Sequence, residues 1–413
     1  MLSLASDLTR NRTAIAKRTA LRMGDALRSR WLALAVLFVI RLAMAFQFQS
    51  VAAVAPLLGD VFGVSFADIG WLIGLYFAPG LVLALPGGAI GKRFGDRPTV
   101  MASLLLMLIG EVAMALSPSW FMQIAGRLVS GAGGVVFNVQ MTKMVAEWFA
   151  GREIATAMAI YINSWPAGIA LSLVFLPPIA TAFGVAAVYL VVAVSIALGL
   201  VFFAAAYPRP RKITTTAAGS SWPDRNTFIA LIAAGLLWGL FNVGFTTIFS
   251  FGPSMLAERG WSISAACSVI SIVLWLAVIS VPLGGYLADR TGQPNLVLVG
   301  GCIIFAVLMI ILPRGNAVIS TVTAIGLLSG LPVGPIMSLP ARILKPETRA
   351  IGMGIFYTLN YATMMLGPIV AGAVAKSTGN AASAFDFGTI VILACPTLLW
   401  AFNRLPEAQP KIA

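Results

Sequence analysis

Long apolar stretches separated by short polar segments fill almost the whole chain. A helix that crosses a bilayer needs about 20 mostly apolar residues, and stretches of this length recur along the sequence. They lie near residues 30–56, 69–90, 98–117, 119–147, 154–176, 183–206, 227–255, 263–287, 294–313, 316–341, 350–375 and 384–403. The pattern therefore predicts an all-α integral membrane protein with twelve transmembrane helices.

The composition supports this class of protein. Of the 413 residues, 59% are hydrophobic and only 10% are charged, whereas a soluble domain carries roughly 25% charged residues. Histidine is absent, and Cys267, Cys302 and Cys395 are scattered within apolar stretches, which excludes a Cys/His metal site and a disulfide framework. Without histidine, paired carboxylates or a nucleophile motif, we expect no enzyme activity, no cofactor and no bound metal.

The net charge of +13 reflects topology and does not indicate a nucleic-acid partner. Most Lys and Arg residues lie in the first 30 residues, in alternate loops, at the centre of the chain and at its C-terminal end. On the opposite side, only Arg259, Arg314 and Lys376 are basic. By the positive-inside rule both termini are cytoplasmic. We expect a multi-pass protein of a bacterial-type cytoplasmic (inner) membrane, with a retained basic tail, since the first apolar run is too long for a signal peptide.

Residues 87–98, GGAIGKRFGDRP, combine glycines with a lysine in the manner of a phosphate-binding loop. Such a loop requires glycine, four spacers, Gly-Lys and then Ser or Thr. Here Pro86 occupies the first glycine position and Arg93 occupies the hydroxyl position. The segment is therefore not a nucleotide site and needs another explanation.

The chain contains an internal repeat. One constant shift aligns Pro56 with Pro253, Gly63 with Gly260, Ser65 with Ser262, Gly87 and Gly88 with Gly284 and Gly285, Arg93 with Arg290, and Gly95 with Gly292. Between the copies, residues 207–226 form a break in composition, with prolines, a basic cluster and small polar residues. We expect a cytoplasmic tail (1–30), a six-helix half (31–206), a cytoplasmic linker (207–226), a second six-helix half (227–405) and a short cytoplasmic tail (406–413).

Three motifs connect this repeat to a known family. GGYLADRTG at 284–292 is close to the family's loop signature, GGAIGKRFG at 87–95 is its first-half copy, and RLVSGAG at 127–133 resembles a fourth-span arginine motif. Through these residues, and over nearly the whole chain after residue 30, the sequence resembles the major facilitator superfamily. The resemblance implies two pseudo-symmetric six-helix halves, a solute site at their interface near mid-membrane, and alternating exposure of that site as one half rocks on the other.

The resemblance also implies a conformational latch in the two glycine-rich loops. In the family, an aspartate of the first-half loop caps a second-half helix, but this chain has Lys92 at that position and keeps Asp289 in the second copy. A lysine cannot accept a helix-terminal N–H bond. Either Asp96 replaces the aspartate or the latch is weaker, unless the basic residues only follow the positive-inside rule. The candidate latch residues are Gly88, Lys92, Arg93, Gly95, Asp96, Asp289, Arg290 and Gly292.

Arg41, Glu111 and Arg127 lie deep within predicted spans, where each charge costs roughly 2.5–3.5 kcal/mol. Arg41 is expected about 15 Å deep, near the midplane. Its guanidinium suits a carboxylate or another oxyanion, and bonds to backbone carbonyls are the alternative. Glu111 and Arg127 are expected at similar depths in a helix hairpin. They form a structural ion pair, or Glu111 titrates and releases Arg127 to the substrate, or the two do not meet.

Other polar residues are candidates for solute contacts. Asn138 lies on the same helical stripe as Arg127, together with Gly131 and Gly134. Further candidates, for each of which interhelical packing is the alternative, are Gln49, Asn242, Tyr357, Asn360 and Tyr361. Pro332 and Pro335 remove backbone donors, so their helix must bend or break, as a gate or as a fixed kink.

The sequence therefore predicts a secondary active transporter of a small organic solute. An anionic solute is favoured because two arginines and one carboxylate lie in the core. Protons are the candidate coupling ion, as in a symporter, since Glu111 is the sole deep carboxylate, and we expect a monomer in the lipid bilayer. Two alternatives stay open: a neutral aromatic or heteroaromatic solute, taken up or exported, and a non-transporting receptor or scaffold on the same fold.

Overall fold

The computed structural model describes residues 30–149, 153–208, 221–345 and 347–406. Within these ranges the chain forms helices and no strands, so the predicted all-α fold is confirmed. Helix Arg30–Ala53 comes first. It is followed by α2 (Ala55–Phe62), α3 (Phe66–Gly74), α4 (Gly80–Phe94), α5 (Asp96–Leu116), α6 (Trp120–Trp148), α7 (Ile154–Phe183), α8 (Val185–Ala206), α9 (Arg225–Glu258), α10 (Ile263–Thr291), α11 (Pro294–Arg314), α12 (Val318–Leu328), α13 (Val333–Ile343), α14 (Arg349–Thr378) and α15 (Ser383–Asn403).

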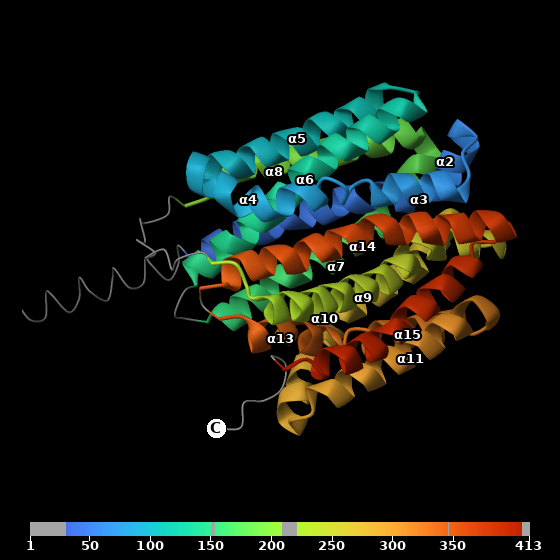
Figure 1. The fold of residues 1–413 in the computed structure, drawn as a ribbon. Helices are drawn as coiled ribbons and strands as arrows, with labels where there is room; N and C mark the ends of the chain where they lie inside the picture. The colour runs from blue at the N-terminus through green and yellow to red at the C-terminus, as the bar shows by residue number, and fades with distance from the viewer. Residues whose placement is uncertain (1–29, 150–152, 209–220, 346, 407–413) are drawn as a thin grey trace, which may run out of the picture.

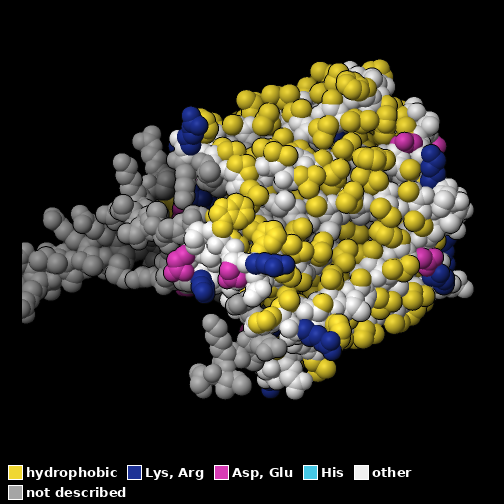
Figure 2. Space-filling model, viewed as in Figure 1, with side chains coloured by type: hydrophobic (Ala, Val, Ile, Leu, Met, Phe, Trp, Pro, Cys, Tyr) yellow, Lys and Arg dark blue, Asp and Glu magenta, His cyan; other side chains and the backbone are white. Residues whose placement is uncertain are grey.

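Many of these helices can cross a bilayer. In the described ranges, ten helical segments are long and apolar enough, or eleven if α2 and α3 are joined across their bend of 118°. Helix α6 has 29 residues but is not among them, and it buries Gln123, Arg127 and Gln140. The view in Figure 2 shows a broad hydrophobic belt with charged side chains gathered towards the two ends of the molecule. A multi-span membrane protein is confirmed, whereas the count of twelve stays a prediction.

The helices form two groups (Figure 1). In the first, α5 packs against α6 and α8, and in the second, α9 packs against α14 and α15. Between the groups, α14 packs along α3 and α4, and α7 packs along α10. The start of helix Arg30–Ala53 and the end of α15 lie at one end of the bundle, here called the terminal end, and the opposite end is called the far end. This arrangement agrees with two halves, although their predicted boundaries stay predictions.

The second predicted span is broken in its middle. Helices α3 and α4 are separated by turns at residues 75–79. Both pieces follow the same partner helix, because Gly70 meets Pro368 and Gly80 meets Tyr361 on α14. They therefore form one path from the far end to the terminal end, with irregular backbone at mid-depth.

A second break separates α12 from α13. Pro332 is the N-cap residue of α13, and the freed N–H of Gly330 donates to the Ser280 hydroxyl at 3.0 Å. Pro335 lies in the first turn of α13, where a missing N–H leaves no helical bond unmade. The break that the prolines predict is present, and its role as a gate stays a prediction.

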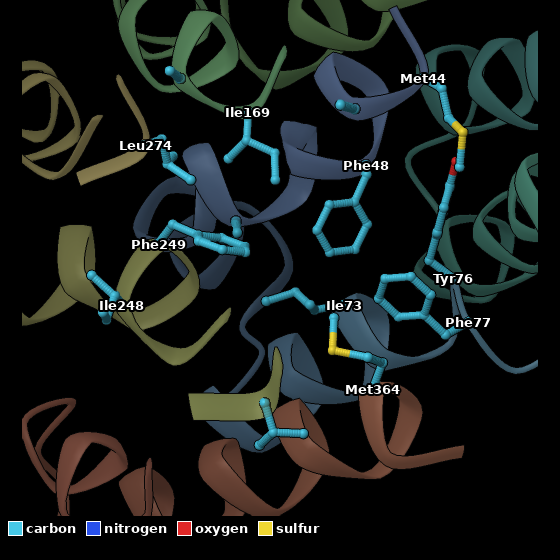
Figure 3. Close-up of a cluster of buried hydrophobic side chains, with 14 of the residues drawn as sticks. Met44, Phe48, Ile73, Tyr76, Phe77, Ile169, Ile248, Phe249, Leu274 and Met364 are labelled. Carbon is cyan, nitrogen blue, oxygen red and sulfur yellow. The ribbon is translucent and has the colours of Figure 1, made fainter. Parts of the chain in front are cut away.

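Apolar side chains from both groups fill the centre of the bundle (Figure 3). The Phe48 ring lies 5.3 Å from the Tyr76 ring and 5.0 Å from the Phe77 ring, measured between centres. Phe249 and Met364 enter the same cluster from the second group. The two groups therefore share one core near the middle of the molecule.

Candidate functional site

Arg41 lies at mid-length in helix Arg30–Ala53 and is anchored on α7. Its NH1 nitrogen donates to the carbonyl oxygens of Tyr161 at 2.8 Å and Ile162 at 3.2 Å, and its guanidinium lies 4.3 Å from the centre of the Tyr161 ring. Its Nε donates to the Asn138 Oδ1 atom at 3.3 Å. Within the described residues NH2 makes no hydrogen bond, and the side chain is only partly buried. Nε and NH1 are thus occupied, and the NH2 nitrogen is left to donate to another partner.

Asn138 connects Arg41 to the second group of helices. Its Oδ1 accepts from Arg41, and its Nδ2 donates to the Tyr361 hydroxyl at 3.1 Å. The Tyr361 ring is stacked with the Phe77 ring, their centres 6.1 Å apart. Three predicted residues on helix Arg30–Ala53, α6 and α14 are therefore brought together across the interface.

Asn242 and Asn360 form a second polar pair between α9 and α14. The Asn242 Nδ2 atom donates to the Asn360 Oδ1 atom at 3.2 Å and to the Trp238 carbonyl at 2.8 Å. Tyr357 lies one turn before Tyr361 on α14 and is partly exposed. These residues are near the predicted site, but both members of the asparagine pair belong to the second group, so helix packing accounts for this bond.

Gln49 does not face a solute in this structure, contrary to its predicted role. It is fully buried, and its Nε2 donates to the Phe249 carbonyl at 2.8 Å. The amide thereby joins helix Arg30–Ala53 to α9. Its Nε2 is thus satisfied on backbone, whereas its buried Oε1 has no partner among the described residues.

Arg127 is completely buried and directs its donors to backbone. Its Nε donates to the Leu72 carbonyl at 3.1 Å, and its NH1 and NH2 donate to the carbonyls of Gln47 at 3.4 Å and Phe48 at 2.6 Å. The guanidinium also lies 4.6 Å from the centre of the Tyr76 ring. Each nitrogen is occupied, so direct substrate binding by Arg127 is not seen here. The guanidinium instead holds α3 beside the first helix.

Glu111 and Arg127 do not form the predicted ion pair. The ion pairs among the described residues do not include them. Gln47 lies between the two, since its Nε2 donates to the Glu111 Oε2 atom at 2.9 Å while its carbonyl accepts from Arg127. Ser50 donates to the other carboxylate oxygen at 3.3 Å. The carboxylate is therefore satisfied by neutral donors and the guanidinium by carbonyls.

Gln47 and Tyr76 are central to this buried cluster, and the sequence did not single them out. A buried amide six residues after Arg41 was the available signal for Gln47. Tyr76 packs into the glycine stripe of α6, where a Cβ atom at Gly131 would overlap the Tyr76 carbonyl oxygen and one at Gly134 would overlap its hydroxyl. The predicted space beside Arg127 is thus filled by Tyr76.

In the first-half loop, Asp96 does not cap a helix of the second group. Its carboxylate pairs with Lys143 of α6 at 2.7 Å, inside its own group. The proposal that Asp96 replaces the missing aspartate is therefore not supported by this arrangement. Gly95 has φ of +88° between α4 and α5, a conformation that favours glycine. Arg93 is exposed, and the side-chain surroundings at Gly88 and Lys92 lie outside the described residues.

The second glycine-rich loop, at residues 284–292, borders a cavity. Gly292 ends α10 in the left-handed region, with φ of +64°, and Arg290 donates to the Tyr286 hydroxyl at 3.0 Å. Asp289 and Arg342 line a cavity of about 430 Å³ at the terminal end of the second group. The second-loop latch residues are thus located, while a latching function stays a prediction.

The fold and this interface define a transporter built from two helical halves, and comparison with known proteins identifies its family. The model of the Major Facilitator Superfamily matches residues 37–341 and 227–413. The chain belongs to this superfamily of membrane transporters. The prediction that it is a transporter rather than an enzyme is thereby confirmed.

Several curated proteins are similar over most of the chain. The nitrite extrusion protein of Bacillus subtilis is 23% identical over 337 residues, which cover 78% of this chain and 82% of that protein. The putative tartrate transporter of Agrobacterium vitis is 23% identical over 387 residues, covering 85% and 88%. A shorter match to azole resistance protein 1 of Saccharomyces cerevisiae, 37% identical over 70 residues, covers only 11% of that protein.

Solved structures share the fold. A bacterial homolog of the human lysosomal transporter Spinster, in an inward-facing and occupied conformation, has a TM-score of 0.73 at 17% identity and covers 93% of this chain and 99% of its own. The nucleoside transporter NupG has a TM-score of 0.71 at 13% identity, covering 91% and 100%. At these identities the likeness concerns the fold alone.

Proposed function

We propose that the protein is a secondary active transporter of a small organic anion, which binds between the two halves at Arg41. The observation that supports this most is the NH2 nitrogen of a partly exposed guanidinium at mid-depth, which bonds to none of the described residues and lies in a cluster with Asn138 and Tyr361. A guanidinium matches the geometry of a carboxylate. The solutes named for the nitrite and tartrate relatives are anions as well.

Protons are the coupling ion in this proposal, and Glu111 is their carrier. Glu111 is the fully buried acidic residue among those that the structure describes. It contacts Gln47, whose carbonyl accepts from Arg127. Protonation of Glu111 would therefore alter, through Gln47, the contacts between helices that Arg127 stabilises. The charge pattern supports an inner-membrane protein with both termini cytoplasmic, and in this proposal the protein acts as a monomer.

The experiment compares carboxylates with their carboxamide analogues. Thermal unfolding of the purified protein is measured with a panel of both, because a bound solute raises apparent stability. Carboxylates that stabilise are then labelled and tested for uptake into proteoliposomes. We expect stabilisation and flux with at least one carboxylate and neither with its carboxamide. Equal effects of the two analogues would contradict the anion proposal.

The substitution Arg41→Gln tests whether Arg41 binds the solute. Hydrogen bonds to charged groups contribute roughly 1.5–3 kcal/mol, so the stabilising carboxylate should bind roughly ten- to a hundredfold more weakly. Arg314→Gln is the matched control, because Arg314 is exposed and pairs with Asp386 away from the site. Unchanged affinity in Arg41→Gln would show that Arg41 does not bind the solute.

A further inference from the structure

Aromatic side chains from both groups of helices lie near the Arg41 guanidinium. The guanidinium lies 4.3 Å from the centre of the Tyr161 ring and 5.9 Å from the centre of the Trp165 ring, both on α7. From the second group, Tyr357 and Tyr361 of α14 act electrostatically on Arg41. We call these four residues the aromatic wall: Tyr161, Trp165, Tyr357 and Tyr361.

Two members of the aromatic wall are incompletely covered by the protein. Trp165 and Tyr357 are partly exposed, although they lie inside α7 and α14 rather than at the helix ends. The Trp165 ring is stacked with the buried Phe48 ring, their centres 5.3 Å apart, so it is held in place by the core. The wall therefore presents fixed aromatic surface beside the Arg41 guanidinium.

Within the described residues, Arg41 is the deep cation that has a nitrogen left to bond. Arg127, the other deep arginine, has each nitrogen occupied by a backbone carbonyl. In the described parts of α9 to α15, each charged residue lies in the first or last turn of its helix. A second carboxylate on a solute would therefore enter the core without a cation to pair with, at a large cost in desolvation.

We infer that the solute is an aromatic monocarboxylate, whose one carboxylate accepts from the Arg41 NH2 nitrogen and whose flat ring packs on the aromatic wall. Guanidinium groups stack on aromatic faces, and aromatic rings pair more favourably with one another than their buried area alone explains. This inference rests on the proposed function. It adds two requirements, a single negative charge and an aromatic ring.

Matched pairs of ligands test the requirement for a ring. Benzoate is compared with cyclohexanecarboxylate and phenylacetate with cyclohexylacetate, because each pair shares its carboxylate and carbon skeleton and differs in aromaticity. The rise in unfolding temperature of the purified full-length protein with ligand concentration gives the affinity. We expect the aromatic member to bind roughly three- to tenfold more tightly. Aromatic members that bind no more tightly than their saturated partners, or that do not stabilise the protein, would overturn the inference.

A second comparison tests the requirement for a single charge. Terephthalate carries two carboxylates on one ring, whereas its monomethyl ester keeps the ring and one carboxylate. We expect the ester to bind at least roughly tenfold more tightly, because the second carboxylate of terephthalate is buried without a partner. Terephthalate that binds as tightly as the ester would overturn the restriction to monocarboxylates.

The substitution Trp165→Leu tests whether the aromatic wall selects the ring. Leucine keeps an apolar side chain there, so the ratio of benzoate to cyclohexanecarboxylate affinity should fall towards one. Trp400→Leu is the matched control, because Trp400 also has an arginine over its ring, Arg404 at 3.7 Å, and lies at the terminal end. A folded Trp165→Leu protein that keeps the native ratio would contradict selection by the wall. The ligand pairs need no variant, so they decide if Trp165→Leu does not fold.

Failure of this inference and failure of the anion proposal give different results. If saturated and aromatic carboxylates bind equally, and each binds more tightly than its carboxamide, the aromatic requirement is overturned and the anion proposal is supported. If benzamide binds as tightly as benzoate, the anion proposal is contradicted, and this inference with it.

Discussion

The Asn138 amide donates to the Tyr361 hydroxyl at 3.1 Å and accepts from Arg41 at 3.3 Å. The first bond crosses from α6 to α14, so the orientation of an arginine in one half depends on a tyrosine in the other. If a solute binds Arg41 as proposed, its site is therefore completed only when the halves are in contact. This relation makes Tyr361 a direct test of the interface.

Tyr361→Phe should weaken binding of a stabilising carboxylate roughly three- to tenfold. The ring still packs on Gly80, but the hydroxyl that orients Asn138 is lost, and a neutral hydrogen bond contributes about 0.5–1.5 kcal/mol. Tyr286→Phe is the control, since the Tyr286 hydroxyl accepts from Arg290 at the terminal end, away from the site. The shift of unfolding temperature with solute concentration measures the affinity. Equal affinity in both variants would show that the cross-half bond does not support the site.

Arg127→Lys should destabilise the protein even though the charge is kept. One ammonium cannot replace a planar group that donates to the carbonyls of Leu72, Gln47 and Phe48. We expect a loss of at least ~2 kcal/mol, because buried carbonyls lose charged donors. Thermal unfolding without solute is the measurement. Full stability with weaker solute binding would instead support the substrate-binding role that the sequence suggested.

Glu111→Gln separates coupling from binding. The amide can keep the contacts with Gln47 and Ser50, but it cannot release a proton. We expect solute exchange between equal concentrations to continue, while accumulation driven by a pH gradient is lost. Both are measured in proteoliposomes, with Glu147→Gln as control because that carboxylate lies near the terminal end beside Lys143. Gradient-driven accumulation at the native rate in Glu111→Gln would contradict the proton-carrying role.

The sequence identified Arg41, Asn138 and Tyr361 because a polar group in an apolar span must find a partner inside the protein. It did not reveal which helix covers which face. The stripe of Gly131 and Gly134 was visible from helical phase, yet the side chain that fills it, Tyr76, comes from another helix. Partners of this kind depend on tertiary packing, and the periodicity within one span carries no information about which helix packs against it.

The prediction found the helix break at Pro332 and missed the one between α3 and α4, although Pro79 is the N-cap residue of α4 there. Pro332 marks the break between α12 and α13, whereas Pro166 remains inside the continuous helix α7. The break between α3 and α4 coincides with a donation from Arg127 to the Leu72 carbonyl, which supplies a hydrogen bond that irregular backbone lacks. Whether a span bends therefore depends on a distant side chain as well as on its own prolines.

The N-cap of α9 provides a pH-dependent contribution to stability. Asp224 accepts from the Thr227 backbone N–H at 2.8 Å and from its hydroxyl at 3.0 Å. These hydrogen bonds, the one from the backbone first, lower the pKa of Asp224 below its ordinary value of 3.8. A carboxylate with a lowered pKa in the folded state stabilises above the unfolded-state pKa, and the stabilisation is lost as the pH falls through the folded-state value.

Asp224→Ala should therefore lower stability at neutral pH by about 1 kcal/mol, the usual cost of losing an N-cap. The difference between this variant and the native protein should shrink as the pH is lowered below about 4 and should vanish once Asp224 is protonated in both states. Asp224→Asn is the control, because its amide oxygen still accepts the cap bond from the Thr227 backbone N–H but does not titrate. Thermal unfolding of the three proteins across the acidic range measures the effect. A gap between the native protein and Asp224→Ala that is equally large at neutral and at strongly acidic pH would show that the carboxylate charge does not contribute to the cap.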